Sequence, residues 1–313
     1  MLSPVMKLLL DALNERVLVS DGAMGTQLMD AGLELGGAGV LWNVTESDKV
    51  VAIQRRYVEA GSDCLITNTF SANGSMLDRH GLRGRLAEIN RAAVEVARRA
   101  FAEAGREGWV LGDVGPVGGV LEMWGGDMTE EEAREAVVPQ VDALVEAGAD
   151  AIIVETQTDA EEAAIGVGAA KAAGAPCVIV SFAYDCTADG ARCHTMMGVS
   201  PEDAARKFVE LGADIIAMNC GTGLPMAGVS GVISAYRATG AVLTMAQPNA
   251  GTPEMIGGTA VYKQSPEEFA ASVPAALEAG VNIVGGCCGS TPEHIAAIRR
   301  VVDQWKPGAT QKP

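Results

Sequence analysis

The stretch Glu278-Ala279-Gly280-Val281-Asn282-Ile283-Val284-Gly285-Gly286-Cys287-Cys288-Gly289 decides the fold. Its first half predicts a helix end closed by glycine, followed by a short strand that is buried on both faces. Two adjacent cysteines follow among glycines, and Ser290-Thr291-Pro292-Glu293 then has the cap, proline and acid of a helix start. The stretch therefore predicts a loop at the C-terminal end of a strand, where α/β folds build their active sites.

The same pattern occurs earlier in the chain, each time before a short apolar run: Glu59-Ala60-Gly61-Ser62-Asp63, Glu146-Ala147-Gly148-Ala149-Asp150 and Glu210-Leu211-Gly212-Ala213-Asp214. Further apolar runs at 17–19, 109–111 (before Gly112-Asp113), 177–180 and 241–244 complete a set of eight strands that alternate with helical stretches. This number of units in 313 residues is the size of a TIM barrel, and a doubly wound sheet is the main alternative.

Polar or reactive residues follow the strands from one end of the chain to the other: Asn68-Thr69, Glu155-Thr156, Asn219-Cys220 and Cys287-Cys288. Only a closed barrel brings all of them to one face, since an open sheet would leave the first and last far apart. We therefore predict an α/β protein with a single (β/α)8 TIM-barrel domain over residues 10–303 and a C-terminal tail over 304–313.

Composition excludes several functions. The net charge of -17 argues against a nucleic-acid partner and against an anionic membrane surface. No apolar run reaches the roughly 18–20 residues of a membrane span, and the N-terminus lacks a signal-peptide pattern, so we expect a cytoplasmic protein. The seven cysteines predict free thiols or a metal site rather than a disulfide framework.

Cys220, Cys287 and Cys288 are the candidate metal ligands. All follow buried strands, and three thiolates with an open fourth position are typical of catalytic zinc. The alternative is three packed thiols. Cys186 and Cys193 lie in a polar loop, and their spacing fits no familiar ligand pattern.

Two acids at strand ends are candidate anchors for a substrate. Asp21, before a glycine-rich loop, could bind an amino group, and Glu155 is a second anionic anchor. The alternative for each acid is a helix cap or a surface position. The loop after Asp21 lacks both the P-loop ending and the dinucleotide fingerprint.

Six motifs carry a family resemblance: Asp21-Gly22-Ala23-Met24-Gly25-Thr26, Thr67-Asn68-Thr69-Phe70, Val154-Glu155-Thr156, Asn219-Cys220-Gly221, Pro248-Asn249-Ala250-Gly251 and Gly285-Gly286-Cys287-Cys288-Gly289. In this order they resemble the homocysteine S-methyltransferase family, over nearly the whole chain. The resemblance implies a homocysteine-binding barrel with one catalytic Zn²⁺ on Cys220, Cys287 and Cys288. It also implies that Asp21, Gly22 and Glu155 contact homocysteine, and we place Asn68, Thr69 and Asn249 in the same substrate site.

This reading predicts an enzyme that methylates the homocysteine thiolate to give methionine, with no catalytic group beyond the metal site. The thiolate is the nucleophile, and zinc can hold it deprotonated. Another thiol or a selenol remains an alternative acceptor, and a non-catalytic zinc-binding barrel is the alternative to an enzyme. The oligomeric state stays open.

The sequence leaves two sources of the methyl group open, and the first is a small onium compound. Trp42, within Leu41-Trp42-Asn43, and Thr195-Met196-Met197-Gly198 resemble bacterial proteins called betaine–homocysteine methyltransferases, and a tryptophan face can hold an onium group. We therefore expect betaine or another onium donor. Against this, the animal betaine enzymes have tyrosines where this chain has Ser71 and Thr156.

A separate methylcorrinoid protein or a methyltetrahydrofolate system is the alternative source of the methyl group. Asn68-Thr69-Phe70 is closer to the methionine-synthase type, in which a corrinoid on another domain carries the methyl. The chain itself should bind no corrinoid, because Arg83 replaces the glycine of the corrinoid loop pattern that begins at Asp78 and His80.

Overall fold

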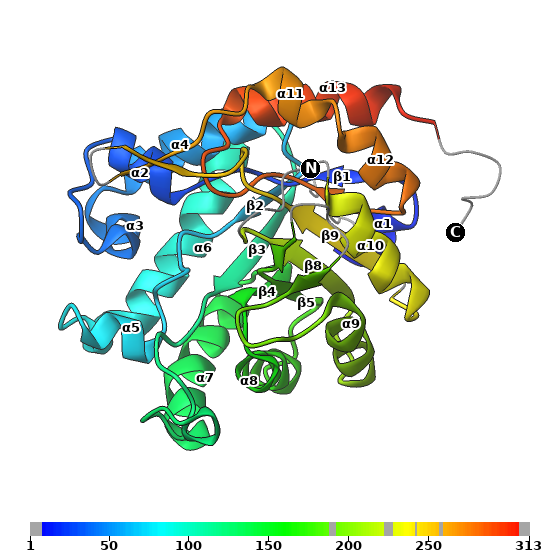
Figure 1. Cartoon of the computed structure of the whole chain (residues 1–313). Coiled ribbons are helices and arrows are strands. Elements are labelled where there is room, and N and C mark those ends of the chain that lie inside the picture. The colour runs from blue at the N-terminus through cyan, green and yellow to red at the C-terminus, as the bar shows by residue number, and fades with distance from the viewer. Residues whose placement is uncertain (1–7, 188–191, 222–227, 242, 257–258, 307–313) are drawn as a thin grey trace.

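Eight parallel strands form the barrel predicted from the sequence, and helices surround it (Figure 1). The computed structural model describes residues 8–187, 192–221, 228–241, 243–256 and 259–306. The hydrogen-bonded order is β1-β12-β9-β8-β5-β4-β3-β2. These strands are β1 (Leu18–Val19), β2 (Cys64–Ile66), β3 (Trp109–Val114), β4 (Ala151–Gln157), β5 (Val178–Phe182), β8 (Ile215–Asn219), β9 (Leu243–Gln247) and β12 (Ile283–Val284).

Apart from α1, which precedes β1, the helices follow the strands on the outside of the barrel (Figure 1). They are α1 (Leu9–Leu13), α2 (Gly25–Asp30), α3 (Trp42–Thr45), α4 (Ser47–Ala60), α5 (Gly74–Asp78), α6 (Leu86–Glu103), α7 (Glu130–Glu146), α8 (Ala160–Ala172), α9 (Pro201–Glu210), α10 (Val229–Ala238), α11 (Pro266–Ala270), α12 (Val273–Glu278) and α13 (Pro292–Gln304). Short 3-10 helices are η1 (Gly39–Leu41), η2 (Arg83–Arg85) and η3 (Glu122–Trp124).

Two positions of the repeated helix-to-strand pattern have a structural role: the glycine, and the acid or amide two residues after it. Each glycine closes its helix in the left-handed region, for example Gly148 with φ 86° and Gly212 with φ 80°. The acid or amide two residues later accepts a hydrogen bond from the first part of a neighbouring strand. Asp150 Oδ2 accepts from Val110 N at 2.6 Å, and Asp214 Oδ2 from Val178 N at 2.8 Å. The repeat therefore joins adjacent strands at the amino end of the barrel.

Two carboxylates bridge the seam between β1 and β2, where no strand ladder is formed among the described residues. Asp63 Oδ2 accepts from Val19 N at 2.9 Å near the amino end, and Asp21 Oδ2 accepts from Ile66 N at 2.8 Å near the carboxyl end. The seam is nearly closed because side chains supply the acceptors that a strand ladder would provide.

The barrel interior is apolar and is covered at its amino end by α1. Leu9 and Leu13 of this helix belong to the same buried cluster as Leu18, Ile153 and Ile283 from the strands. Most other apolar side chains pack between the strands and the surrounding helices. The amino end is thus filled by side chains, which leaves the carboxyl end for a site.

The strand predicted at 241–244 corresponds to β9, which runs from Leu243, and residue 242 lies outside the described residues. Ala241 belongs to the turn that follows α10, because its N–H donates to the carbonyl of Tyr236 at 3.2 Å. Helix α13 ends at Gln304, and most of the predicted tail, residues 307–313, lies outside the described residues.

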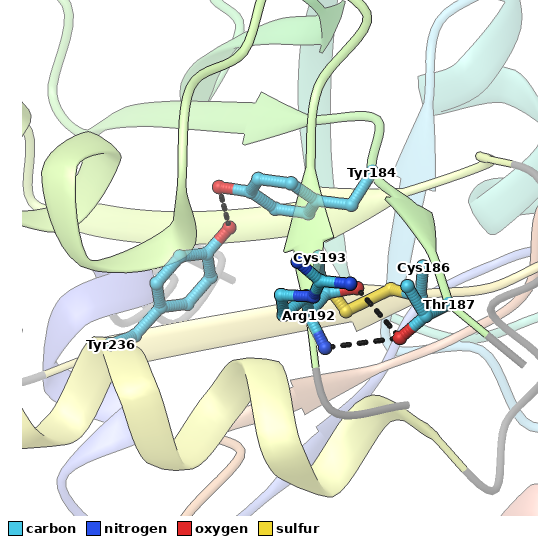
Figure 2. The surroundings of a disulfide bond; sticks show 6 residues. All are labelled: Tyr184, Cys186, Thr187, Arg192, Cys193 and Tyr236. Carbon is cyan, nitrogen blue, oxygen red and sulfur yellow. Dashed lines mark hydrogen bonds between the residues drawn. A yellow bond between two sulfur atoms is a disulfide. The ribbon is translucent and has the colours of Figure 1, made fainter. Parts of the chain in front are cut away.

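Cys186 and Cys193 form a disulfide, so the expectation that the cysteines would be free or metal-bound was wrong for this pair (Figure 2). The two residues lie opposite each other in an antiparallel hairpin of β6 (Asp185–Cys186) and β7 (Cys193–His194), with Cα atoms 4.1 Å apart. Register across a hairpin is set by the turn, and the cysteine spacing alone did not indicate it.

A second hairpin, β10 (Glu254–Ile256) with β11 (Thr259–Val261), follows β9. In the part of the chain that the structure describes, no helix is both long and apolar enough to cross a bilayer.

Candidate active site

A cavity of about 520 Å³ opens at the carboxyl end of the barrel. Its wall includes these predicted site residues, which lie at or after the ends of five different strands: Asp21, Gly22, Asn68, Glu155, Cys220, Cys287 and Cys288. This volume lies in the range of small-molecule sites. The strand ends therefore bring most of the predicted residues to one enclosed place.

The sulfur atoms of Cys220, Cys287 and Cys288 all lie within 4.8 Å of one another. Cys287 Sγ and Cys288 Sγ are 3.9 Å apart, and all three thiols are partly exposed to the cavity. Cys64 and Cys177, in contrast, are buried in the barrel. The cluster thus has the accessibility that a metal ion with a substrate-binding position needs.

The three thiols differ in how readily they ionise. Hydrogen bonds from Cys287 and Cys288 lower the pKa of Cys220. The same contacts raise the pKa of Cys287, and the contact with Cys220 raises that of Cys288 to about 11. Cys220 is therefore the sulfur that is ionised first when no metal is bound, and a cation would displace the protons of the other two.

Two residues at the site have backbone torsions that are rare for residues other than glycine. They are Thr156, with φ 55°, and Cys220, with φ 52°. Asn219 connects them: it accepts from Thr156 N at 3.1 Å and donates to Thr156 Oγ1 at 2.6 Å. Ser181 Oγ also donates to Asn219 Oδ1, at 2.7 Å. Such conformations cost of order 1–3 kcal/mol each and cluster at functional sites, so this network holds Cys220 in place at an energetic cost.

The loop after β1 packs against the cysteine loop. A Cβ atom on Gly22 would lie 2.6 Å from Ser290 Oγ and 2.9 Å from Tyr57 Cε1, so only glycine fits there. Ser290 Oγ accepts from Ala23 N at 3.1 Å, and Tyr57 donates to the carbonyl of Ala23 at 2.7 Å. These contacts fix Asp21, which precedes Gly22, relative to the cysteines.

Asp21 and Glu155 are buried acids in the cavity wall. Burial raises the pKa of Asp21 to about 7, although hydrogen bonds from Ile66 N and Ser20 oppose the rise. Burial, with the nearby Asp21 and Cys220, raises the pKa of Glu155 to about 8. No lysine, arginine or histidine is among the described residues that line the cavity. A ligand with a positive charge would therefore relieve an electrostatic penalty that the protein does not relieve itself.

Asp113, near the end of β3, is a third acid in the same wall, and the sequence analysis did not select it. It lies on β3, which pairs with β4, the strand that carries Glu155, and the two carboxyl groups affect each other's pKa. The signal for it was present, because Gly112-Asp113 occupies the same strand-end position as the residues that were chosen. However, a single aspartate at a strand end gave no reason to interpret it as a site residue rather than as a helix cap.

Asn68 lines the cavity, but its amide also supports the wall, since Nδ2 donates to the carbonyl of Gly39 at 2.9 Å. Thr69 is completely buried behind the cavity, and its hydroxyl donates to the carbonyl of Asp113 at 2.7 Å. Asn249 is hydrogen-bonded to the thiol of Cys220 and donates to the carbonyl of Gly221 at 3.1 Å. Thr69 and Asn249 thus support the wall rather than line it.

Trp42 is not among the described residues that line the cavity. The ammonium of Lys49 lies 4.6 Å from the centre of its ring, so one face of the indole already has a cationic neighbour. Its role on the donor side stays a prediction.

Tyr262, after the β10–β11 hairpin, is a further residue that sequence reasoning missed. Its side chain is hydrogen-bonded to the thiol of Cys288. No sequence signal could have found it, because it follows none of the barrel strands.

Comparison with known proteins gives consistent matches. The family model described as homocysteine S-methyltransferase matches residues 18–302. The methionine synthase of Mycobacterium tuberculosis is 34% identical over 95% of this chain, and that of Mycobacterium leprae is 32% identical over 97%. The chain spans only 26% of the length of each of these relatives.

Among solved structures, the metallated form of the homocysteine methyltransferase MmuM from Escherichia coli is similar, with a TM-score of 0.74. The match covers 93% of this chain and 98% of that one, at 23% sequence identity, and it supports the barrel fold. Because the family model matches almost the entire barrel, the chain belongs to the homocysteine S-methyltransferase family.

Proposed function

We propose that the protein transfers a methyl group to the thiolate of homocysteine, giving methionine, with one zinc ion held by Cys220, Cys287 and Cys288. The observation that carries the proposal is the cluster of three partly exposed thiols within 4.8 Å, in one cavity with buried acids. Homocysteine has the two groups that such a cavity would bind, a thiol and an ammonium.

The thiol geometry fits zinc. Zinc–sulfur bonds of about 2.3 Å in a tetrahedron place neighbouring sulfur atoms about 3.8 Å apart. Cys287 Sγ and Cys288 Sγ lie 3.9 Å apart, and Cys220 is already the preferred thiolate. Zinc on these thiolates would supply the positive charge that keeps an acceptor thiol deprotonated at neutral pH.

Other residues at the cavity would bind and orient the acceptor. Asp21 and Glu155 face the cavity without a basic partner among the described residues, so they would receive the ammonium of homocysteine. Asn219 holds the backbone of Thr156 beside them and lies 3.9 Å from Cys287 Sγ. Anchoring the acceptor at both ends would leave its sulfur in one position for attack on the methyl group.

For the donor we propose betaine or another small onium compound, with Trp42 near it. A methyl group from a separate methylcorrinoid protein or a methyltetrahydrofolate system is the second candidate. It is favoured by the similarity to methionine synthases, of whose length this chain spans 26%. We also propose that the chain binds no corrinoid itself and acts in the cytoplasm.

The test is a methyl-transfer assay with zinc-loaded protein and homocysteine, in which methionine is measured. The donors are betaine, dimethylsulfoniopropionate, S-methylmethionine, methyltetrahydrofolate and methylcobalamin. Turnover with an onium compound supports the first donor, and turnover with methylcobalamin alone supports the second. No methionine with any donor, and no binding of homocysteine to the zinc-loaded protein, would reject the proposed acceptor.

A matched pair of variants tests the metal site. Cys287→Ser should lose both bound zinc and methyl transfer, whereas Cys177→Ala, in the barrel core, should keep both. Unchanged zinc content in Cys287→Ser would reject the site.

A further inference from the structure

The buried carboxyl pair of Asp113 and Glu155 carries an inference that rests on the proposed function and adds a residue to it. We propose that Asp113 is a positioning residue: it donates a hydrogen bond from its protonated carboxyl to Glu155 and so holds the Glu155 carboxyl in place to receive the ammonium of the acceptor.

The backbone of Asp113 is held in place by neighbouring side chains. Its N–H donates to Thr67 Oγ1 at 2.9 Å. Its carbonyl accepts from Thr69 Oγ1 at 2.7 Å and from Gln140 Nε2 at 3.1 Å. The side chain is only 2% exposed and lines the cavity. The position of this carboxyl is therefore fixed before any ligand binds.

The two carboxyl groups can be hydrogen-bonded only if they share a proton, since two carboxylates have no donor between them. Asp113 is the better place for this proton, because it is the more buried of the two residues. Burial raises the pKa of Asp113 well above its usual range, and the hydrogen bond with Glu155 raises it further. Burial, Asp21 and Cys220 raise the pKa of Glu155 to about 8, and the contact with Asp113 opposes that rise. An ammonium bound beside Glu155 would lower its pKa further and leave it ionised.

The second oxygen of Asp113, Oδ1, has no hydrogen-bond partner among the described residues. A charged carboxylate in this position would be strongly penalised, whereas a neutral acid that donates through its other oxygen is tolerated. Asp21 differs, because it accepts from Ile66 N and Ser20 Oγ. Asp113 therefore serves as a donor to Glu155, and Asp21 and Glu155 are the acids that would ionise beside a bound ammonium.

The experiment compares two side chains of nearly the same shape as aspartate. Asp113→Asn keeps an N–H donor toward Glu155, and Asp113→Leu removes it. Binding to the zinc-loaded protein is measured by calorimetry for homocysteine and for 4-mercaptobutanoate, which has the same thiol, chain and carboxylate but no amino group. Zinc content and melting temperature verify that each variant is folded and loaded.

We expect Asp113→Asn to bind homocysteine within about threefold of the wild type, because its donor is kept. Asp113→Leu should weaken homocysteine binding by about tenfold or more, the usual effect of a lost hydrogen bond to a charged group. Binding of 4-mercaptobutanoate should change by less than about twofold in both variants, since it has no ammonium to place.

Equal weakening of both thiols in Asp113→Leu would show a general structural role and overturn the proposal. If Asp113→Leu does not fold, Asp113→Asn decides alone: weakening of homocysteine by about tenfold would mean that the acid itself is needed, against a donor role. Failure of the wild type to bind homocysteine would instead reject the proposed function.

Discussion

Replacing Asp21 with asparagine should stabilise the metal-free protein at neutral and alkaline pH. The carboxyl of Asp21 is 2% exposed, and its pKa is raised from 3.8 to about 7 by burial. A raised pKa in the folded state means that this acid contributes no penalty below the unfolded pKa. The penalty grows as pH rises toward the folded pKa, because the unfolded chain ionises first.

Raising the pKa of Asp21 from 3.8 to about 7 lowers the free energy of unfolding by about 4 kcal/mol when the pH is well above 7. Between pH 5 and pH 8 alone, the free energy of unfolding of the wild type should fall by about 2.5 kcal/mol relative to that of Asp21→Asn. Asparagine can keep the contacts, since one oxygen still accepts from Ile66 N and its amide can donate to Ser20 Oγ.

The assay is urea unfolding of the metal-free wild type and Asp21→Asn at pH 5 and pH 8, without reductant so that the hairpin disulfide is intact. Asp142→Asn, on the exposed face of α7, is the control for removing one negative charge. A stability difference between Asp21→Asn and the wild type that does not change from pH 5 to pH 8 would refute the reasoning. The same variant should bind homocysteine more weakly, because it removes one of the two proposed charges that face the ammonium.

Other changes probe the cysteine loops. Denatured protein should react with thiol reagents at five cysteines before reduction and at seven after it, and reaction at seven without reduction would contradict the disulfide. Gly221→Ala should weaken zinc binding in a metal competition titration, because Gly221 has φ 82° and its Cβ would lie 2.1 Å from the carbonyl oxygen of Tyr184; unchanged affinity would mean that the Cys220 loop shifts freely. Asn219→Ala should lower the free energy of unfolding by about 1–3 kcal/mol, since it leaves Ser181 and Thr156 without their buried partner, and a smaller loss would show that the network is weak.

Much of the fold could be predicted because its signals are local. The glycine and acid of each repeat mark a helix end and a strand start. The structure shows that the same acid, as at Asp150, also joins neighbouring strands. The cysteine cluster could be predicted for a related reason: in a parallel barrel every strand ends at the same face, so the position of Cys220 in the sequence already gives its position in the site.

What could not be predicted depends on contacts between loops and on pairs of side chains. Cys186 and Cys193 meet because of the hairpin register, and Tyr262 reaches Cys288 from a loop with no strand of its own to place it. Asp113 had the right position, but its proposed role depends on the carboxyl of Glu155 on the neighbouring strand β4. Such partnerships appear only when distances are known.

The seam between β1 and β2 links the stability of the barrel to its proposed function. Asp21 accepts the hydrogen bond from Ile66 N that a strand ladder would otherwise make, so its carboxylate has a structural reason to be there. The same buried carboxylate lies in a cavity wall without a basic neighbour among the described residues, where its charge is costly. A ligand ammonium would offset that cost, and therefore binding of the acceptor should tighten the barrel at the seam between β1 and β2, where the described strands form no ladder.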